Sequence, residues 1–221
     1  MPTARVEART AQLAGAGLAL AYLVLALLRA VVVAEGAPWE RRWLLAWHAA
    51  PPIPYDWAVR VTLLGSAGAV LAVLLAVSAV WLLRRRRAEL LTAWIATGLL
   101  LVLDYTAKGA FHRLRPALFP HPAAYGLAFP SGHSLFAAGF YGTIVGLWAR
   151  GAPRPARRLA AAAWLLLALA VGVSRLILGV HWPTDVLAGY HAGAVVAGTA
   201  CRIHRLWLAS PNEDPAPGGR L

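Results

Sequence analysis

Residues 159–178 read LAAAAWLLLALAVGVSRLIL, and the only strongly polar side chains in the stretch are Ser174 and Arg175, close to its end. About 20 consecutive apolar residues in a helix are enough to cross the ~30 Å hydrocarbon core of a bilayer. The stretch therefore predicts a transmembrane helix, and it indicates that the chain is a membrane protein.

The composition points the same way. Of 221 residues, 60% are hydrophobic and 14% are charged, and the mean hydropathy is +0.61. A soluble domain has roughly 25% charged and 45–50% apolar residues, so this class is excluded, together with disordered and collagen-like chains. The single cysteine, Cys201, excludes an internal disulfide framework and a cysteine-based zinc cluster.

Five further stretches have a similar apolar character. They cover residues 11–34, 61–83, 90–107, 134–149 and 186–207. The predicted fold is an all-α bundle of six transmembrane helices, forming a single membrane-embedded domain over residues 1–209. Residues 210–221 are polar and rich in Pro and Gly, which predicts a disordered tail. The first span is too long for a signal peptide and is expected to belong to the mature fold.

Basic residues in the loops predict the orientation. Twenty of the 21 basic residues are arginine, and the formal net charge is +12. Thirteen of them flank the spans on one side and seven on the other. By the positive-inside rule, both termini are expected in the cytoplasm. Nucleic-acid binding would need basic residues interleaved with aromatic ones on one folded face, and no such pattern is present, so no nucleic-acid partner is expected.

The longer outer loop, residues 35–60, carries Trp39, Trp43 and Trp47 at intervals of four. This spacing places the three indoles on one helical face, and Pro51–Pro52 ends the helix. We interpret the segment as an interfacial helix on the outer leaflet. Passive anchoring and guidance of a lipid substrate are both compatible with this pattern.

A second set of polar residues is not explained by topology. In the predicted topology its members lie at the outer ends of four different spans, and so at one membrane face. They are Lys108 (the only lysine), Arg115, Ser131, Gly132, His133, Arg175, His181 and Asp185. The thirteen basic residues that define the cytoplasmic side in this topology all lie in other loops and at the termini, apart from this set.

Three of these residues bring positive charge to one place, which costs free energy unless an anion lies between them. They are Lys108, Arg115 and Arg175. Ser131 adds a hydroxyl, and Gly132 lets a ligand approach backbone N–H groups at the start of a helix, where anions bind well. Arginine suits the recognition of phosphate oxygens. The set predicts a phosphate site.

The remaining residues supply reactive groups. His181 and Asp185 are four residues apart on one helical face, so the carboxylate fixes one imidazole nitrogen and leaves the other free to attack. His133 would donate a proton to the leaving oxygen. Asp185 is the only acid expected at the site, with Asp104 one turn below Lys108, so we predict phosphoryl transfer through a phosphohistidine without a metal or cofactor. Asp104 lies four residues before Lys108, and this spacing fits an ordinary i, i+4 ion pair as well as it fits a catalytic role for Asp104.

Three motifs now resemble a known signature, K-x6-R-P, P-S-G-H and S-R-x5-H-x3-D. The chain reads Lys108-GAFHRL-Arg115-Pro116, Pro130-Ser131-Gly132-His133 and Ser174-Arg175-LILGV-His181-WPT-Asp185. It is similar to the type 2 phosphatidic acid phosphatase family, which shares its site with vanadium haloperoxidases and bacterial acid phosphatases. The resemblance spans residues 108–185, and the six-span layout extends it over most of the chain.

The resemblance implies roles that agree with those inferred from the residues. His181 is then the nucleophile, assisted by Asp185, and His133 is the acid. The phosphate would be bound by Lys108, Arg115, Ser131, Gly132 and Arg175. Compact bacterial members act at the outer face of the plasma membrane on phosphatidylglycerol phosphate, phosphatidic acid or undecaprenyl pyrophosphate, so we expect a lipid phosphate substrate within the bilayer.

Three alternatives stay open at this point. The first is a phosphatase for undecaprenyl pyrophosphate, the cell-wall carrier lipid. The glycine of Pro130-Ser131-Gly132-His133 favours a broader lipid phosphatase, since some dedicated carrier-lipid enzymes have aspartate there. A haloperoxidase would need vanadate and is known in large soluble proteins. A transporter or lipid-binding protein without turnover would have no use for a nucleophile and an acid. The oligomeric state and the preferred lipid chain are not predicted.

Overall fold

The computed structural model describes residues 4–31, 34–50, 53–118 and 126–209. Within these ranges the chain consists of helices and contains no strand, which confirms the all-α class. The expected disordered tail, residues 210–221, and the Pro51–Pro52 turn lie outside the described residues.

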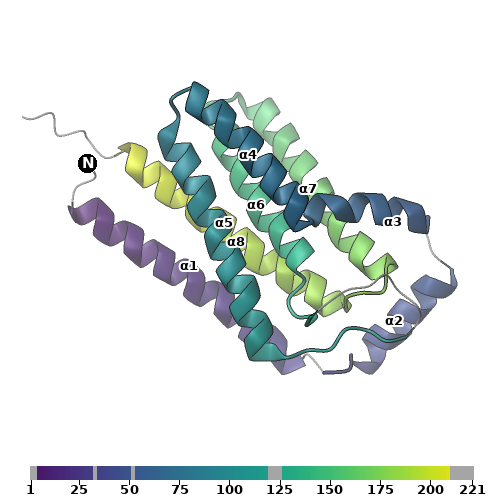
Figure 1. Cartoon of the computed structure of the whole chain (residues 1–221). Helices are drawn as coiled ribbons and strands as arrows, with labels where there is room; N and C mark the ends of the chain where they lie inside the picture. Colours follow the sequence, from purple (N-terminus) through teal and green to yellow (C-terminus); the bar gives the residue numbers. More distant parts are fainter. Residues whose placement is uncertain (1–3, 32–33, 51–52, 119–125, 210–221) are drawn as a thin grey trace, which may run out of the picture.

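The helices follow one another in a simple order (Figure 1). They are α1 (Ala4–Val31), α2 (Pro38–Ala49), α3 (Tyr55–Thr62), the 3-10 turn η1 (Leu63–Gly65), α4 (Ala67–Leu83), α5 (Arg87–Phe111), α6 (Gly132–Trp148), α7 (Arg154–Ile177) and α8 (Pro183–Ala209). Each of the six predicted spans overlaps one of the long helices α1, α4, α5, α6, α7 and α8, although the span predicted over residues 61–83 also includes the end of α3 and η1.

Length and apolar composition single out some of these helices as membrane spans. In the described part of the chain, Ala8–Ala26 of α1, α5 and α7 are long and apolar enough to cross a bilayer, and a fourth span is added if the bent pair Tyr55–Gly65 and Ala67–Leu83 is counted as one. The number of six spans and the cytoplasmic position of both termini therefore stay predictions.

The helices that fall below this threshold do so for identifiable reasons. Helices α4 and α6 have 17 residues each. Helix α8 is long, but the side it turns to α6 consists of small residues. A Cβ on Gly193 would lie 2.8 Å from the backbone nitrogen of Gly139 and would also collide with the carbonyl oxygen of Leu135. The two helices pack backbone to backbone, as small residues allow between membrane helices.

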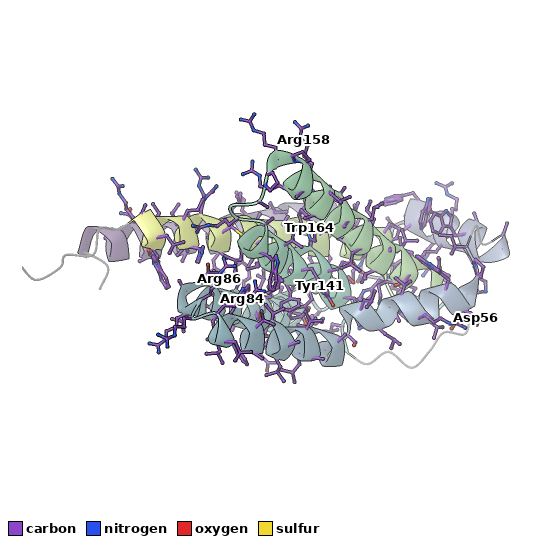
Figure 2. All side chains as sticks on the ribbon, turned by 90° about the horizontal axis from the view of Figure 1, so that it is seen from above. Asp56, Arg84, Arg86, Tyr141, Arg158 and Trp164 are labelled. Carbon is purple, nitrogen blue, oxygen red and sulfur yellow. The ribbon has the colours of Figure 1, made fainter. Side chains whose placement is uncertain are left out.

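The outer surface of the bundle is apolar. Leu71, Leu101 and Leu166 are 51%, 55% and 68% exposed, although soluble monomers rarely show extended apolar surface. Figure 2 shows Arg84 and Arg86 far from Asp56, which lies on α3 at the other end of the molecule. An apolar belt between charged ends is what a bilayer requires.

The span predicted over residues 61–83 is not one straight helix. It begins within α3 and bends by 49° between η1 and α4. Ser66 sits at the bend, where its hydroxyl accepts a hydrogen bond from the N–H of Ala69 at 3.2 Å and so caps α4. Tyr141 of α6 holds the other side of the bend by donating a hydrogen bond to the Leu64 carbonyl at 2.7 Å.

The interfacial helix predicted within residues 35–60 corresponds to α2. Its Trp43 and Trp47 rings stack with centroids 4.1 Å apart, and Trp39 is 48% exposed. Trp43 and Trp47 also pack against buried residues of the protein, and the adjacent side of α2 buries Leu44 together with a charged residue, Glu40. Its position on the outer leaflet stays a prediction.

Candidate active site

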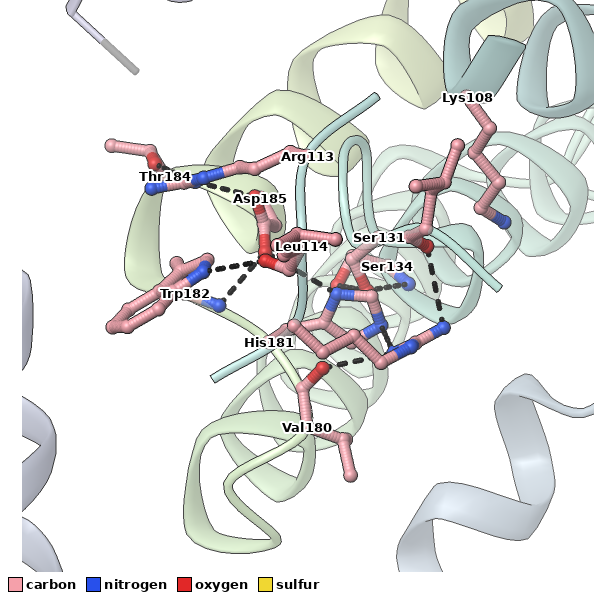
Figure 3. A network of polar contacts seen from close by, with 12 residues as sticks. Lys108, Arg113, Leu114, Ser131, Ser134, Val180, His181, Trp182, Thr184 and Asp185 are labelled. Carbon is pink, nitrogen blue, oxygen red and sulfur yellow. Dashed lines mark hydrogen bonds and ion pairs between the residues drawn. The ribbon is translucent and has the colours of Figure 1, made fainter. Parts of the chain in front are cut away.

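The eight residues singled out in the sequence gather at one end of the bundle, and Figure 3 labels Lys108, Ser131, His181 and Asp185 among them. Four helix ends and two connecting segments contribute them. They are Lys108 at the end of α5, Arg115 and Ser131 between α5 and α6, Gly132 and His133 at the start of α6, Arg175 at the end of α7, His181 between α7 and α8, and Asp185 in the first turn of α8.

Asp185 holds the turn that carries His181. Its Oδ2 accepts a hydrogen bond from the Trp182 N–H at 2.8 Å and lies 3.5 Å from Nδ1 of His181. The turn precedes Pro183, the first residue of α8, so the carboxylate also occupies the electropositive start of that helix. Both side chains are buried, but His181 precedes α8, so the two residues do not share a helical face as the spacing predicted. The buried Nδ1 of His181 has no hydrogen-bond partner within the described structure.

The other imidazole nitrogen of His181 faces Arg115. The Nη1 atom of Arg115 lies 3.0 Å from Nε2 of His181 and also donates to the Val180 carbonyl at 2.8 Å. Because a guanidinium group has donors and no acceptor, Nε2 must be the unprotonated nitrogen. The proton is therefore on Nδ1, which faces the Asp185 carboxylate, and the Nε2 lone pair points to the cationic side of the site.

The surroundings keep this imidazole neutral. Burial, aided by the positive charges of Arg115, Arg175 and Lys108, holds the pKa of His181 well below its usual value near 6.5. Both causes disfavour the charged ring. At neutral pH His181 is consequently an uncharged base with a free lone pair, which is the form that a nucleophile needs.

The start of α6 is tied to the start of α8 by its backbone. The Ser131 N–H donates to the Asp185 carbonyl at 2.9 Å, so this group is not available to an anion. The Ser131 hydroxyl caps α6, since it accepts hydrogen bonds from the Ser134 N–H at 3.5 Å and the Ser134 hydroxyl at 3.1 Å. An anion at this helix start would meet the N–H groups of Gly132 and His133.

Lys108 forms the ion pair that its spacing from Asp104 allows. Its Nζ lies 2.8 and 2.6 Å from the two carboxylate oxygens of Asp104. This confirms the i, i+4 pair. Gly132 lies against the pair, because a Cβ on this residue would stand 3.3 Å from Nζ and 3.0 Å from Oδ1 of Asp104. The absence of a side chain at Gly132 thus brings the Lys108 ammonium next to the start of α6.

Arg175 and His133 face the bend between α3 and α4. The Arg175 Nη1 donates to the Thr62 hydroxyl at 2.6 Å, and its side chain is buried in the described structure. A Cβ on Gly65 would lie 3.0 Å from the His133 ring. The bend therefore closes one side of the site, with Thr62 holding a predicted phosphate ligand and Gly65 lying against the predicted acid.

Two buried charged residues were missed in the sequence. Arg113, counted there only as a loop charge, is 1% exposed, and Glu40 of α2 is fully buried. His112 ends α5 in the left-handed conformation, with φ of 47°, and turns the chain so that Arg113 enters the protein. Arg113 reaches both Asp185, at 2.5 Å, and Glu40, at 2.6 Å. Its position inside the first motif was the only available signal.

The assembled groups are those needed for acyl or phosphoryl transfer: an oriented neutral histidine, a second histidine, and several cations around the space between them. In the described ranges, no three His, Cys, Asp or Glu residues are grouped to hold a metal ion. Arginine and lysine at this density favour an anionic substrate such as a phosphate.

Comparison with known sequences identifies relatives with named activities. A sequence model of the PAP2 superfamily matches residues 87–208. The chain is 29% identical to phosphatidylglycerophosphatase B of Bacillus subtilis (strain 168) over 138 residues, which cover 62% of this chain and 68% of that protein. It is 41% identical to phosphatidylglycerophosphatase B of Escherichia coli (strain K12) over 97 residues, 43% of this chain and 35% of that one. The chain thus matches about a third of the E. coli protein.

Two solved structures share the fold. The crystal structure of a transmembrane PAP2 type phosphatidylglycerolphosphate phosphatase from Bacillus subtilis superposes with a TM-score of 0.77 at 23% identity, covering 85% of this chain and 95% of that chain. The crystal structure of Aquifex aeolicus LpxE superposes with a TM-score of 0.59 at 24% identity, covering 77% and 99%. The family match contains all eight predicted site residues.

Proposed function

Because this chain belongs to the PAP2 superfamily, as its motifs predicted, we propose that it hydrolyses the phosphate of a membrane lipid through a phosphohistidine on His181, without a metal ion. The chain is a PAP2-type lipid phosphatase. We propose in addition a particular lipid substrate, a covalent intermediate and the outer membrane face as the side of the site. Phosphatidylglycerol phosphate is the first substrate to test, since both named relatives are phosphatidylglycerophosphatases.

The hydrogen bond from Arg115 to Nε2 of His181 carries the proposed mechanism. It defines Nε2 as the lone-pair nitrogen and Nδ1 as the protonated one, with Asp185 behind it. In the first step Nε2 attacks phosphorus, the bond from phosphorus to the lipid oxygen breaks, and His133 gives that oxygen its proton. In the second step His133 takes a proton from water, the resulting hydroxide attacks phosphorus, and the bond to Nε2 breaks.

The cations would hold the phosphoryl oxygens during both steps. Arg115 contacts the attacking nitrogen in the described structure. When the substrate binds, its N–H would donate to a phosphoryl oxygen instead of to Nε2 of His181. Lys108 and Arg175 flank the same space, and the N–H groups at the start of α6 add donors. Such preorganised donors stabilise the charge that develops in the transition state.

The proposed location is the plasma membrane of a bacterium, with a multi-pass chain and the site at its outer face. The apolar surface of the bundle and the transmembrane relative support membrane insertion. The side of the membrane is inferred from the arginine-rich loops at the end opposite the site. Labelling of a single cysteine placed at residue 41, in a background without Cys201, tests it. Reaction with an impermeant reagent in intact cells is expected, and reaction only after lysis would invert the topology.

The experiment that tests the function is phosphate release by the detergent-purified protein in EDTA. Phosphatidylglycerol phosphate, phosphatidic acid and undecaprenyl pyrophosphate are offered separately, with the His181→Ala protein as the blank. His191→Ala is the matched control, because His191 is exposed on α8, the helix that follows His181, and in the described structure its Nδ1 contacts only the Leu187 carbonyl of its own turn. Turnover by the wild type and by His191→Ala, and none by His181→Ala, is expected.

The ranking of the substrates separates the alternatives. A strong preference for undecaprenyl pyrophosphate would identify a carrier-lipid phosphatase. If no substrate released phosphate above the blank, the site would be one for binding, and a lipid-binding protein or transporter would replace the phosphatase. The intermediate is tested by rapid quenching of the wild type with labelled substrate, where label retained on the protein in an acid-labile form, and none on His181→Ala, is expected. Turnover by the wild type with label absent under every quench would exclude the covalent mechanism.

A further inference from the structure

Asp185 takes part in a buried network of three charges. The other two members are Arg113 and Glu40, and all three side chains are at most 1% exposed in the described structure. Charges are seldom buried to this extent unless each is paired and hydrogen-bonded. The network lies directly behind His181, on the side away from the cations of the phosphate site.

Arg113 bridges the two carboxylates. Its Nη1 donates to Oδ1 of Asp185 at 2.5 Å and to the Thr184 hydroxyl at 2.7 Å, and its Nη2 donates to Oε2 of Glu40 at 2.6 Å. The two oxygens of Asp185 are thereby divided. Oδ1 accepts the hydrogen bond from Arg113, whereas Oδ2 accepts one from the Trp182 N–H and faces Nδ1 of His181.

Glu40 is fixed at the far end of the bridge. Its Oε1 accepts from the Thr184 hydroxyl at 2.7 Å and the Thr184 N–H at 3.2 Å, and its Oε2 also accepts from the Ala37 N–H at 2.9 Å. The Trp182 ring covers Arg113, with the guanidinium carbon 5.5 Å from the ring centroid. Gly36, at φ of +82°, lets the chain before α2 lie directly on that ring.

The charge of Glu40 has a consequence for Asp185. Arg113 paired with Asp185 alone would make a neutral pair, and the field of the carboxylate at His181 would be weakened. With Glu40 included, the three groups sum to minus one, so a full negative charge remains behind the imidazole. Attack on phosphorus makes the imidazole positive, and that charge needs an anion to stabilise it.

We propose that Glu40 and Arg113 are positioning residues for the phosphatase reaction: together they orient the Asp185 carboxylate and preserve its negative charge behind His181. The inference rests on the proposed function, because it deepens the role of the same site. It also gives α2 a part in the reaction, since Glu40 is the charged residue that this helix buries.

A purely structural ion pair is the competing explanation, and stability alone does not distinguish the two. Buried ion pairs are often replaceable by apolar residues without loss of stability, so burial by itself does not explain the network. The distinguishing readout is kcat against KM. The phosphate ligands do not touch Glu40, and a positioning role therefore predicts a change in kcat with KM unchanged.

The test compares Glu40→Gln, the double variant Glu40→Gln/Arg113→Gln, and the control Glu35→Gln. Glu35 is an exposed carboxylate just before α2 that pairs only loosely with Arg41, at 3.9 Å. In Glu40→Gln the network becomes neutral, and kcat is expected to fall about ten- to hundredfold, the range for groups that orient a functional side chain from behind. In the double variant the sum returns to minus one, and kcat is expected to recover several-fold. Glu35→Gln should match the wild type.

The proteins are compared per folded molecule, as judged by size-exclusion elution and thermal midpoint in detergent. Wild-type kcat retained in Glu40→Gln, or a double variant no faster than the single one, would overturn the inference while leaving the phosphatase proposal intact. Turnover in the wild type that is no higher than in His181→Ala would instead remove the proposed function, and the positioning role with it. A rise in KM at constant kcat would assign the network to substrate binding.

Discussion

Gly132 and Lys108 lie so close together that a methyl group on the glycine would stand 3.3 Å from the lysine Nζ. The same methyl group would lie 3.0 Å from Oδ1 of Asp104, the partner of that lysine. The start of α6 therefore approaches the ammonium this closely because residue 132 has no side chain. The third residue of the P-S-G-H motif thus has a steric function in addition to exposing its N–H.

Gly132→Ala is accordingly expected to displace Lys108 and Asp104 by a few tenths of an ångström and to lower kcat/KM. A displaced ligand of this kind costs between about tenfold and a hundredfold. The matched control is Gly109→Ala, one residue after Lys108, where an added Cβ meets nothing within 4 Å. Steady-state kinetics on the best lipid substrate measure the effect, and equal kcat/KM in the two variants would disprove the steric role.

Asp185→Asn is expected to keep the fold and to lose most of the turnover. The amide retains the shape of the carboxylate but loses its charge, and it no longer fixes the Nδ1 proton of His181. The loss of an orienting carboxylate in a comparable position lowers kcat by about 10⁴-fold. Asp56→Asn is the control, because Asp56 is an exposed carboxylate in the first turn of α3. A kcat within tenfold of the wild type would restrict Asp185 to capping α8.

Acid is expected to destabilise the folded protein through His181. The pKa of His181 lies well below 6.5 in the folded state, because burial and the neighbouring cations oppose the charged ring, and near 6.5 in the unfolded chain. As the pH falls below that value, the unfolded chain binds a proton that the folded protein does not, so unfolding is favoured. Above it the ring is neutral in both states and contributes no pH dependence.

Thermal midpoints in detergent, measured between about pH 8 and about pH 5, test this. The wild type should lose stability on the acidic side more steeply than His181→Asn, by up to about 1.4 kcal/mol per pH unit. Parallel curves for the two proteins would mean that His181 is not held neutral by the fold.

Gly193→Ala is expected to destabilise the bundle by about 1–3 kcal/mol, the cost of overpacking a tight contact. The added Cβ would meet backbone atoms of α6, with the Gly139 nitrogen at 2.8 Å, and backbone cannot rotate away as a side chain does. Gly198→Ala on the same helix has open space around the new Cβ and should be neutral or slightly stabilising. The two thermal midpoints are compared, and equal values would contradict backbone contact between α6 and α8.

The positions of the long helices were predictable from the sequence, because the predicted spans depend on continuous apolar stretches that also form the helices. The bend at Ser66 was not, since Gly65 and Ser66 lie inside an apolar run and nothing local indicates a break. Helix α8 is also harder to recognise as a span from its apolar composition, for a physical reason. Helix α8 faces another helix with glycine and alanine, so it needs fewer large apolar residues than a helix that faces lipid on all sides.

That the eight residues lie together at one end of the bundle was predictable because they belong to short motifs at the ends of successive helices, while their roles stay predictions. The arrangement behind them was not. Glu40 and Arg113 are 73 residues apart, and in sequence each looks like an ordinary loop or surface charge. Only the folded chain shows that they meet under Trp182. The engagement of the Ser131 N–H by Asp185 was equally hidden, because it joins the starts of two helices that are distant in sequence.

The family match begins at residue 87, yet the chemistry borrows two groups from the chain before it: the Glu40 carboxylate behind Asp185 and the Thr62 hydroxyl on Arg175. The protein thus divides into the part that carries the three motifs and the part before it. The two parts are covalently joined through the turn between α4 and α5, and they also pack together elsewhere, as α1 does against α8 and α3 against α7. We expect that a chain cut in that turn gives two fragments that are each inactive alone, and that phosphate release returns when both are made in the same membrane.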